Sequence, residues 1–459
     1  MFQSKLIIAL LVGLFAVVAP ARSQIALPPV QTPDLRVLQT EPLDRTVNGI
    51  VGQADLGRLR ELRQLRIRGL LRTHRTVLEA DPRGAPIVRN EVVALSPTPE
   101  ALDRARASGF AIGRTRTLDG LDVTIVVLQA PPGMSTRRAL QSLRDADPDG
   151  TYDFNHVYLE SGQVGDAADQ APASQKSPPR SVVAVTAREP SLRLAALDGA
   201  GEATGVRVGL IDGGVQRAHP VFAGVAIHEH GCVGGGIPSA HGTAVASLLV
   251  GQNNEFHGAA PGAELFAADV YCGLATGGAL DSVAEAFAWM SRQQVPVINI
   301  SLVGPANALL EQIIRVVTSR GHIVVAAVGN DGPSAPPLFP AAYPQVVAVT
   351  GVDAKQRVLL EAGRGKHVDF AAPGANMSAA GVESTFGIVR GTSFASPLVA
   401  GLLARHATAV DKEQSDAAIA SLISRAKDLG AKGIDKIYGN GLVGDDLRPP
   451  EKLASAARQ

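Results

Sequence analysis

Short apolar runs alternate with segments of helical periodicity in the second half of the chain. The runs are nearly continuous in Val, Ile, Leu and Ala, which is typical of strands buried on both faces of a parallel sheet. The predicted strands are residues 206–211, 265–270, 296–302, 322–328 and 346–352. The helices predicted between them are residues 242–250, 282–292 and 306–320. We therefore predict an α/β domain over residues 195–448, with a mostly parallel, twisted sheet and helices on both faces.

Residues 86–160 have a different pattern, in which the elements follow the order β-α-β-β-α-β. The strands are predicted at 88–95, 110–118, 121–128 and 152–158, and the helices at 98–108 and 135–146. Asp119-Gly120 lies between the two middle strands and is a strong hairpin signal. This order predicts a small α+β unit of the ferredoxin-like type.

The first 23 residues have the pattern of a secretory signal peptide. Lys5 precedes an apolar run over residues 6–18, and small residues follow that run. No other apolar run reaches the roughly 18 residues that a membrane span needs. We therefore expect an exported protein, periplasmic or secreted, with no transmembrane anchor once the signal peptide is removed.

Residues 24–85 form an N-terminal extension that contains an arginine-rich helix, predicted over 53–79. Leucines recur on one face of this helix at helical spacing. The arginines of the polar face are Arg58, Arg60, Arg63, Arg66, Arg68, Arg72 and Arg75. We interpret this face as exposed to solvent, with contact to an anionic surface as the alternative.

Amino-acid composition indicates the remaining domain boundaries. Residues 161–194 are rich in Gly, Ala, Gln, Ser and Pro and are predicted to be a flexible linker, whereas 449–459 is predicted to be a loose tail. Lys plus Arg and Asp plus Glu each total 43, which gives no case for a nucleic-acid partner. We interpret His228-Glu229-His230 as a loop and not as a metal site, because the sequence places no third ligand near it.

The chain contains two cysteines, Cys232 and Cys272. An even number in an exported chain permits a disulfide, and two buried free thiols are the alternative.

Four polar residues with catalytic potential lie at element boundaries of the α/β domain. Asp212 and Asn330 follow predicted strands, His241 begins a helix, and Ser393 lies in a small-residue turn before an apolar segment. Ligands of such sheets bind at the carboxyl ends of the strands, where these residues would meet. Each one alone has an ordinary explanation, such as a turn, a helix cap or a buried histidine. Together they are the residue types of a serine nucleophile, its base, an orienting acid and an oxyanion donor.

The motifs around these residues resemble those of the subtilisin (subtilase) family of serine proteases. The Asp, His, Ser order along the chain is the subtilisin order. The matching segments are Gly209-Leu210-Ile211-Asp212-Gly213-Gly214-Val215, His241-Gly242-Thr243-Ala244-Val245-Ala246, and Gly391-Thr392-Ser393-Phe394-Ala395-Ser396-Pro397. Further matches are Gly258-Ala259-Ala260-Pro261, Asn299-Ile300-Ser301-Leu302, Ala327-Val328-Gly329-Asn330 and residues 368–374.

The resemblance implies a serine endopeptidase with a subtilisin-like sheet. Ser393 would be the nucleophile, His241 the base and Asp212 the orienting acid, with Asn330 donating to the oxyanion. The residues implied to bind substrate are Ser301, Leu302, Val303, Gly329 and Leu338. The unit at 86–160 resembles a subtilase propeptide, so the expected partners are polypeptide substrates and the chain's own propeptide. We expect a monomer that processes itself.

Two departures from the family pattern bear on this hypothesis. Gly213 follows the acid where the family usually has Ser or Thr, which removes a hydroxyl near Asp212. Val303 stands where Gly is frequent, and Leu338 adds further bulk, so we predict a pocket for small or medium apolar side chains. The sequence contains no recognisable calcium-ligand cluster, so no cofactor and no metal are expected, although many subtilases bind calcium. The alternative function is a non-catalytic, subtilase-like binding or scaffold protein.

Overall fold

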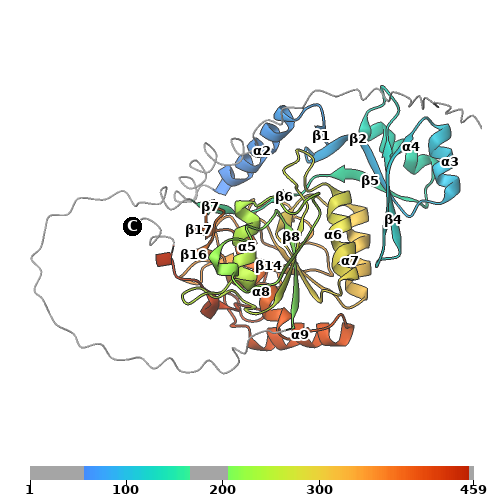
Figure 1. The fold of residues 1–459 in the computed structure, drawn as a ribbon. Coiled ribbons are helices and arrows are strands. Elements are labelled where there is room, and N and C mark those ends of the chain that lie inside the picture. The colour runs from blue at the N-terminus through green and yellow to red at the C-terminus, as the bar shows by residue number, and fades with distance from the viewer. Residues whose placement is uncertain (1–55, 166–204, 454–459) are drawn as a thin grey trace, which may run out of the picture. The chain divides into compact units, whose positions relative to one another are not determined.

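The computed structural model of the chain describes residues 56–165 and 205–453 (Figure 1). The predicted signal peptide, most of the predicted linker and the last six residues lie outside this part of the chain. Within the described ranges, no helix is both long enough and apolar enough to cross a membrane.

A seven-stranded parallel sheet forms the centre of the α/β domain, as predicted. Its strand order is β15-β14-β13-β11-β8-β10-β9, and every neighbouring pair is parallel. The strands are β8 (Arg207–Asp212), β9 (Ile227–His230), β10 (Glu264–Asp269), β11 (Val297–Ile300), β13 (Ile323–Ala327), β14 (Val347–Val352) and β15 (Phe370–Pro373). The interpretation of 228–230 as a loop is wrong, because these residues form the edge strand β9 beside β10.

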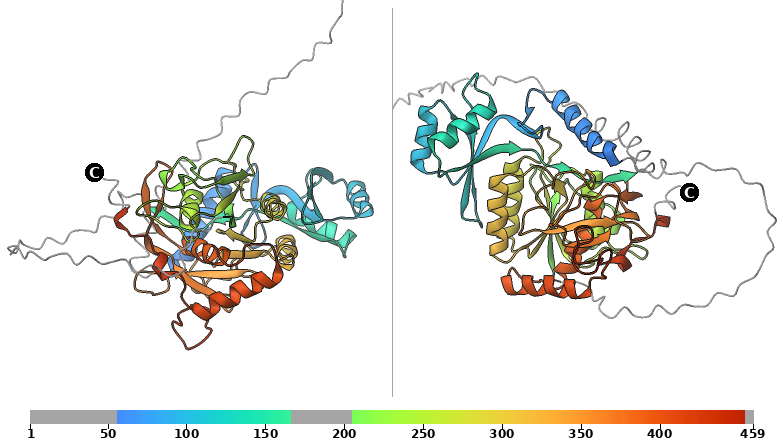
Figure 2. Two further views of the ribbon diagram at one scale, coloured as in Figure 1. Left: turned by 60° about the horizontal axis from the view of Figure 1, so that its bottom comes forward. Right: turned by 180° about the vertical axis from the view of Figure 1, so that it is seen from behind.

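Helices cover both faces of this sheet, which explains its nearly continuous apolar strands. The helices are α5 (Ala240–Val250), α6 (Leu280–Arg292), α7 (Ala308–Ser319), α8 (Ser396–Ala404) and α9 (Lys412–Arg425). Consecutive strand residues face opposite layers. Leu210 belongs to the core formed with α5 and α8, and Ile211 to the core formed with α6 and α7. Figure 2 shows α6 and α7 together on one side of the sheet.

The carboxyl-terminal part of the chain is more ordered than the sequence suggested. An antiparallel hairpin, β16 (Ala375–Ala380) and β17 (Phe386–Arg390), precedes the turn that carries Ser393. A short helix, η4 (Asp445–Leu447), follows α9. Leu453 is buried in the core that contains α5 and α8, and the Ser378 hydroxyl donates to the Pro450 carbonyl. The prediction of a loose tail from residue 449 is therefore wrong for 449–453.

The α+β unit has the predicted strand and helix order. Its antiparallel sheet joins β2 (Pro86–Leu95), β3 (Ala111–Leu118), β4 (Val123–Gln129) and β5 (Thr151–His156), with helices α3 (Pro99–Ala107) and α4 (Thr136–Ala146). Strand β2 lies between β4 and β5, and β3 pairs with β4. Thr98 and Ser135 cap the two helices by accepting from the third amide beyond each of them.

The two faces of this small sheet have different neighbours. Val92 and Val126 pack with α4 in the unit's own core. Val93 and Val127 point the other way and join the core of the α/β domain that contains α6 and α7. Polar contacts accompany this interface, where Arg114 forms ion pairs with Glu91 at 2.8 Å and with Asp281 of α6 at 3.0 Å.

The arginine-rich helix is shorter than predicted. Helix α2 spans Leu56–Thr73, and Leu78–Ala80 form a strand, β1, that pairs with the start of β2. The prediction continued the helical periodicity through residues 77–79, whereas Leu78–Ala80 belong to a strand. The interpretation of a fully solvated arginine face is also wrong, because Arg63 forms an ion pair with Asp331 of the α/β domain at 3.1 Å.

The segment after β5 lies along the α/β domain. Strand β6 (Leu159–Glu160) pairs antiparallel with β12 (Leu302–Val303), and β7 (Gln163–Gly165) pairs antiparallel with β17. Residues 163–165, predicted to belong to a linker, are therefore ordered against β17.

Candidate active site

Asp212 and His241 form a buried pair at the carboxyl edge of the central sheet. Asp212 ends β8, and His241 lies in the first turn of α5, which Ser239 caps by accepting from the Gly242 amide at 2.9 Å. The Nδ1 atom of His241 lies 2.9 Å from Oδ1 of Asp212. A carboxylate at this nitrogen favours the tautomer with the proton on Nδ1 and leaves Nε2 facing the site.

The glycine after Asp212 has a local steric reason. A Cβ at Gly213 would lie 2.3 Å from the Ser239 hydroxyl oxygen, so a serine or threonine would collide with the helix cap. The Gly213 amide donates to Asp212 at 2.7 Å. The carboxylate thus keeps a local donor, and the cap hydroxyl of Ser239 fills the space beside residue 213.

Ser393 lies in a short helix, η3 (Thr392–Phe394), directly before α8. Gly391 precedes it with φ 141°, a conformation that favours glycine, and a Cβ there would lie 2.8 Å from Cα of Gly162. The Ser301 hydroxyl donates to the Ser393 carbonyl at 3.1 Å. Ser301 therefore positions the backbone of the serine turn, in addition to its predicted place beside the substrate.

Asn330 is held so that its amide nitrogen points into the site. Its Oδ1 accepts from the Thr392 amide at 3.0 Å, which leaves Nδ2 to donate to the Ser161 hydroxyl at 2.8 Å. The Thr392 hydroxyl in turn accepts from the Gly329 amide at 3.1 Å. Thr392 thus ties the strand end that carries Asn330 to the turn that carries Ser393.

The segment from Tyr158 to Gly162 lies in this site in an extended conformation. Glu160 pairs with Leu302 and Leu159 with Val303, so the segment adds a strand to the domain. The Ser161 carbonyl oxygen lies 3.3 Å from Nε2 of His241. Gly162 has φ 142°, and a Cβ there would lie 3.4 Å from Cβ of Ser393 and 2.7 Å from the Phe394 ring. Only glycine fits this position beside the serine.

The docked segment also alters the charge of the site. Carboxylate oxygens of Glu160 and Asp212 and a ring nitrogen of His241 lie within 4.8 Å of one another. Burial lowers the pKa of His241, but Asp212 and, to a smaller extent, Glu160 outweigh it and raise this pKa to about 9. Burial raises the pKa of Glu160, and the nearby His241 opposes that rise. The histidine is consequently protonated at neutral pH while the segment is docked.

The predicted pocket residues fall into two groups. Leu302 and Val303 are buried in β12, opposite the docked segment. Leu338 touches Gly329, since a Cβ on Gly329 would lie 2.5 Å from Cδ1 of Leu338. Leu338 also lines a pocket together with Val328, Asp331 and Gly363.

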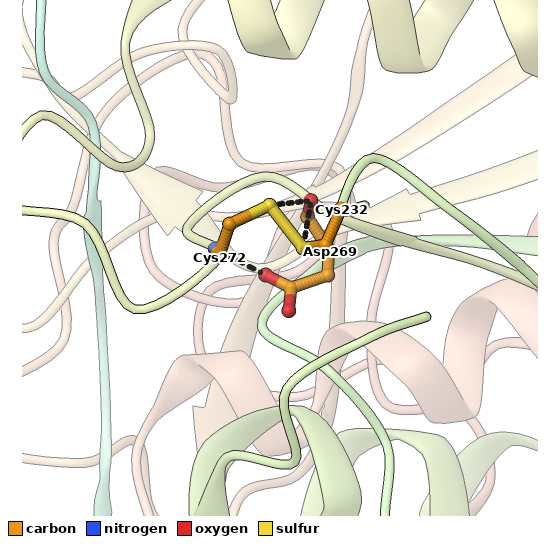
Figure 3. Close-up of side chains that lie close together, drawn as sticks. All are labelled: Cys232, Asp269 and Cys272. Atoms are coloured by element: carbon orange, nitrogen blue, oxygen red, sulfur yellow. Dashed lines mark hydrogen bonds between the residues drawn. A yellow bond between two sulfur atoms is a disulfide. The ribbon is translucent and has the colours of Figure 1, made fainter. Parts of the chain in front are cut away.

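Cys232 and Cys272 are joined by a disulfide, with their Cα atoms 5.4 Å apart (Figure 3). The side chain of Asp269 accepts from the Ile237 amide and from the Cys272 amide, each at 2.9 Å. The disulfide and this carboxylate fasten the loop before α5 to the loop that carries Tyr271.

Potential metal ligands gather at two places in the described part of the chain. One is this cluster, whose sulfurs are bonded to each other, and the other is Glu160 with Asp212 and His241.

Several residues of the site were missed by the sequence analysis. Thr392 and Ser239 orient Asn330 and the start of α5, and Glu160 and Ser161 occupy the site. Ser239 precedes the helix start by the spacing of an N-cap, which is a readable signal. Glu160 and Ser161 carry no such local signal, because their positions follow from pairing with a strand more than 140 residues away.

Comparison with known proteins identifies a family for this chain. The model of the family described as "Subtilase family" matches residues 203–441. Subtilisin BL of Lederbergia lenta is 34% identical over 246 residues, which cover 52% of this chain and 89% of the relative. Subtilisin E of Bacillus subtilis (strain 168) is 31% identical over 251 residues, which cover 52% of this chain and 64% of the relative.

A solved structure has a similar fold. Fervidolysin from Fervidobacterium pennivorans, described as a keratinolytic enzyme related to subtilisin, aligns with a TM-score of 0.62 at 19% identity. The alignment covers 79% of this chain and 61% of that one. The predicted subtilisin-like sheet is thereby confirmed, and the chain belongs to the subtilase family of serine endopeptidases.

Proposed function

We propose that this chain is an exported serine endopeptidase made as a self-processed precursor, with Asp212, His241 and Ser393 as its catalytic triad. The observation that carries the proposal is the position of Ser161. It lies in a strand added to β12, with its carbonyl at His241, its hydroxyl at Asn330 and the next residue against Ser393. A peptide bound to a protease in the same way would add a strand and bring its scissile bond beside the serine, which supports the proposal. The candidate scissile bond is Ser161–Gly162.

The docked arrangement resembles an inhibited complex more than a reacting one. The Ser393 hydroxyl donates to the Ser301 carbonyl at 3.4 Å, and Nε2 of His241, protonated in this state, donates to the Ser161 carbonyl at 3.3 Å. Cleavage would need the serine hydroxyl to rotate to Nε2 of His241 and the Ser161 carbonyl to rotate toward Asn330. Hydrogen bonds of catalytic groups often tighten only as the reaction proceeds, so this geometry is compatible with the proposed roles.

The reaction would then follow the order usual for a serine protease. His241 takes the proton of Ser393 as the hydroxyl oxygen attacks the carbonyl carbon, and Asp212 stabilises the resulting imidazolium. Asn330 Nδ2 and the Ser393 backbone amide donate to the oxyanion. His241 passes its proton to the leaving amine, and water hydrolyses the acyl-enzyme.

The specificity that we propose is for small or medium apolar side chains before the scissile bond. The contact between Leu338 and Gly329 supports it, because it adds bulk beside the site. Profiling with a peptide library would measure this preference. A strong preference for Phe, Tyr or Arg would contradict it.

N-terminal sequencing of protein purified with and without Ser393→Ala tests the proposal. We expect the unaltered chain to yield a product that begins at Gly162, and the variant to remain joined at that bond. Export would be supported by an N-terminus of the Ser393→Ala precursor near residue 24 after expression in a secreting host.

A fluorophosphonate probe separates the proposed enzyme from a non-catalytic scaffold. Only an activated serine reacts with it, so the mature protein should be labelled and Ser393→Ala should not. An unlabelled but folded mature protein would favour the scaffold.

A further inference from the structure

Helix α2 contacts the α/β domain directly, in addition to packing on the α+β unit. Its ion pair between Arg63 and Asp331 is largely buried, with 17% and 15% of the two side chains exposed. Asp331 directly follows Asn330, so this contact is made at the rim of the candidate active site. Removing one partner of a buried ion pair leaves the other charge uncompensated, which makes such contacts costly to break.

A second arginine of the helix reaches the docked segment itself. Nη1 of Arg66 donates to the Glu160 carbonyl at 3.4 Å. Its positive charge also opposes the rise in the pKa of the Glu160 carboxyl that burial causes. The helix therefore contacts the segment one residue before Ser161.

The same helix is within reach of both sides of the docked segment. Arg63 is paired with Asp331 and is also close enough to Tyr271 to interact with it electrostatically. The Tyr271 hydroxyl donates to the Tyr158 carbonyl at 3.1 Å. Arg63 thus interacts both with the residue after Asn330 and, electrostatically, with a tyrosine that holds the segment three residues before Ser161.

Apolar contacts fix the other end of the helix to the same segment. Leu70 and Leu71 pack on a cluster that contains Val157, and Leu159 packs on that cluster too. Leu62, one turn before Arg66, is 8% exposed. The helix therefore contacts the segment in two ways. Its leucines pack beside the segment, and its arginines lie at the rim of the site.

We propose that the rim of the active site is a docking surface for helix α2, which closes over residues 158–161 and holds them in the site. Inhibition of the precursor would then have two parts, the added strand and the helix above it. This inference rests on the proposed function, since it assumes that the segment blocks a working protease.

The test compares two double variants of the full chain. Arg63→Ala/Arg66→Ala removes the two contacts, and Arg68→Ala/Arg72→Ala removes two exposed arginines of the same helix. The first readout is the lag before purified precursor hydrolyses a fluorogenic peptide. We expect the first variant to shorten the lag about tenfold, corresponding to roughly 1.4 kcal/mol, and the second to leave it within twofold of the parent.

A second measurement tests the inference without requiring protease activity. In a Ser393→Ala background, amide hydrogen exchange over residues 158–162 should be faster in Arg63→Ala/Arg66→Ala than in Arg68→Ala/Arg72→Ala. Asp331→Asn removes the partner of Arg63 and should also speed exchange of these amides. Because it leaves the helix sequence unchanged, it tests the contact even if the arginine variant misfolds.

Equal exchange in the two arginine variants, together with no effect of Asp331→Asn, would overturn the inference. Loss of peptide hydrolysis in every variant, including the parent chain, would instead contradict the proposed function. The exchange comparison would still be valid in that case.

Discussion

The two sheets of this molecule bury their faces in different ways. The central sheet of the α/β domain is covered on both faces by helices of the same domain. The small antiparallel sheet covers one face with α3 and α4, whereas Val93 and Val127 on its other face pack into the core of the α/β domain. The central sheet is therefore covered within its own domain, whereas the small sheet is covered on both faces only when its unit is docked.

This difference predicts that the two units would differ in stability if the chain were cut as proposed. A unit that needs its partner to bury an apolar face loses much of its stabilisation once it is released, since burial contributes about 25 cal/mol per Å². Release would also expose that face to proteases. The α/β domain would lose the cover that Val93 and Val127 provide beside α6 and α7 but would keep helices on both faces of its sheet, so release would affect the two units unequally.

The largest expected effect concerns the self-contained domain. Ser393→Ala should lower peptide hydrolysis about a millionfold, because it removes the nucleophile on which the other triad members act. Hydrolysis of a fluorogenic peptide, after the precursor is cut by an added protease, measures this loss. Retention of more than about a hundredth of the activity would assign the chemistry to another residue.

Asn330→Ala should have the next largest effect. Loss of a side-chain donor to the oxyanion lowers kcat about 10²–10³-fold, with KM nearly unchanged. Steady-state kinetics on mature protein separates the two constants. A rise in KM with unchanged kcat would mean that Asn330 binds substrate instead of stabilising the oxyanion.

A matched pair of leucine variants tests the comparison of the two cores directly. Leu140→Ala in α4 and Leu310→Ala in α7 each truncate a buried leucine that packs on its own sheet, 5% and 0% exposed, and should each cost about 2–5 kcal/mol. Chemical denaturation of the Ser393→Ala precursor measures both. We expect Leu140→Ala to lower an early transition of the small unit only, and Leu310→Ala to lower the later one. A single transition shifted by both variants would show that the units unfold together.

The smallest expected effect is on pH dependence. Self-cleavage needs neutral His241, whose pKa is raised to about 9 in the docked state, so the rate should increase with pH up to that value. Glu160→Gln removes one of the charges that raise this pKa and should move the midpoint toward acid by up to about one pH unit. Time courses of precursor loss from pH 6 to 10 give both midpoints. Equal midpoints would show that the Glu160 carboxylate does not contribute to the raised pKa of His241.

The same shift has a consequence for docking. Because the docked Glu160 adds to the rise in the pKa of His241, protonation of His241 favours the docked over the undocked state at pH values below the docked pKa of about 9. This contribution is lost as the pH rises through about 9, so alkaline conditions should weaken retention of the segment.

Sequence patterns predicted the elements that depend on local order. The buried parallel strands were readable because helices on both faces require continuous apolar runs, and the ferredoxin-like order followed from the hairpin at Asp119-Gly120. The positions of Asp212, His241, Asn330 and Ser393 were identifiable because each lies at an element boundary and in a family motif. The family resemblance was confirmed.

Features that depend on distant contacts were not predictable. Strand β9 is short and polar at His228 and Glu229, so its pairing with β10 has no clear local signal. The ion pair between Arg63 and Asp331 joins residues far apart in sequence, and its arginine is one of six on α2. Strands β6 and β7 form by pairing with β12 and β17, which are distant in sequence, and the composition around β7 indicated a linker.

The continuous chain through Ser161–Gly162 would make the proposed inhibition independent of dilution until that bond is cut. While that bond is intact, the segment is tethered to the domain that it blocks, and its effective concentration is independent of how many molecules are present. Cleavage at the bond would convert the segment and α2 into a separate molecule, whose occupancy of the site falls as the pair is diluted. An intact precursor would stay blocked at any concentration, whereas a cleaved one would become active by spreading into a larger volume.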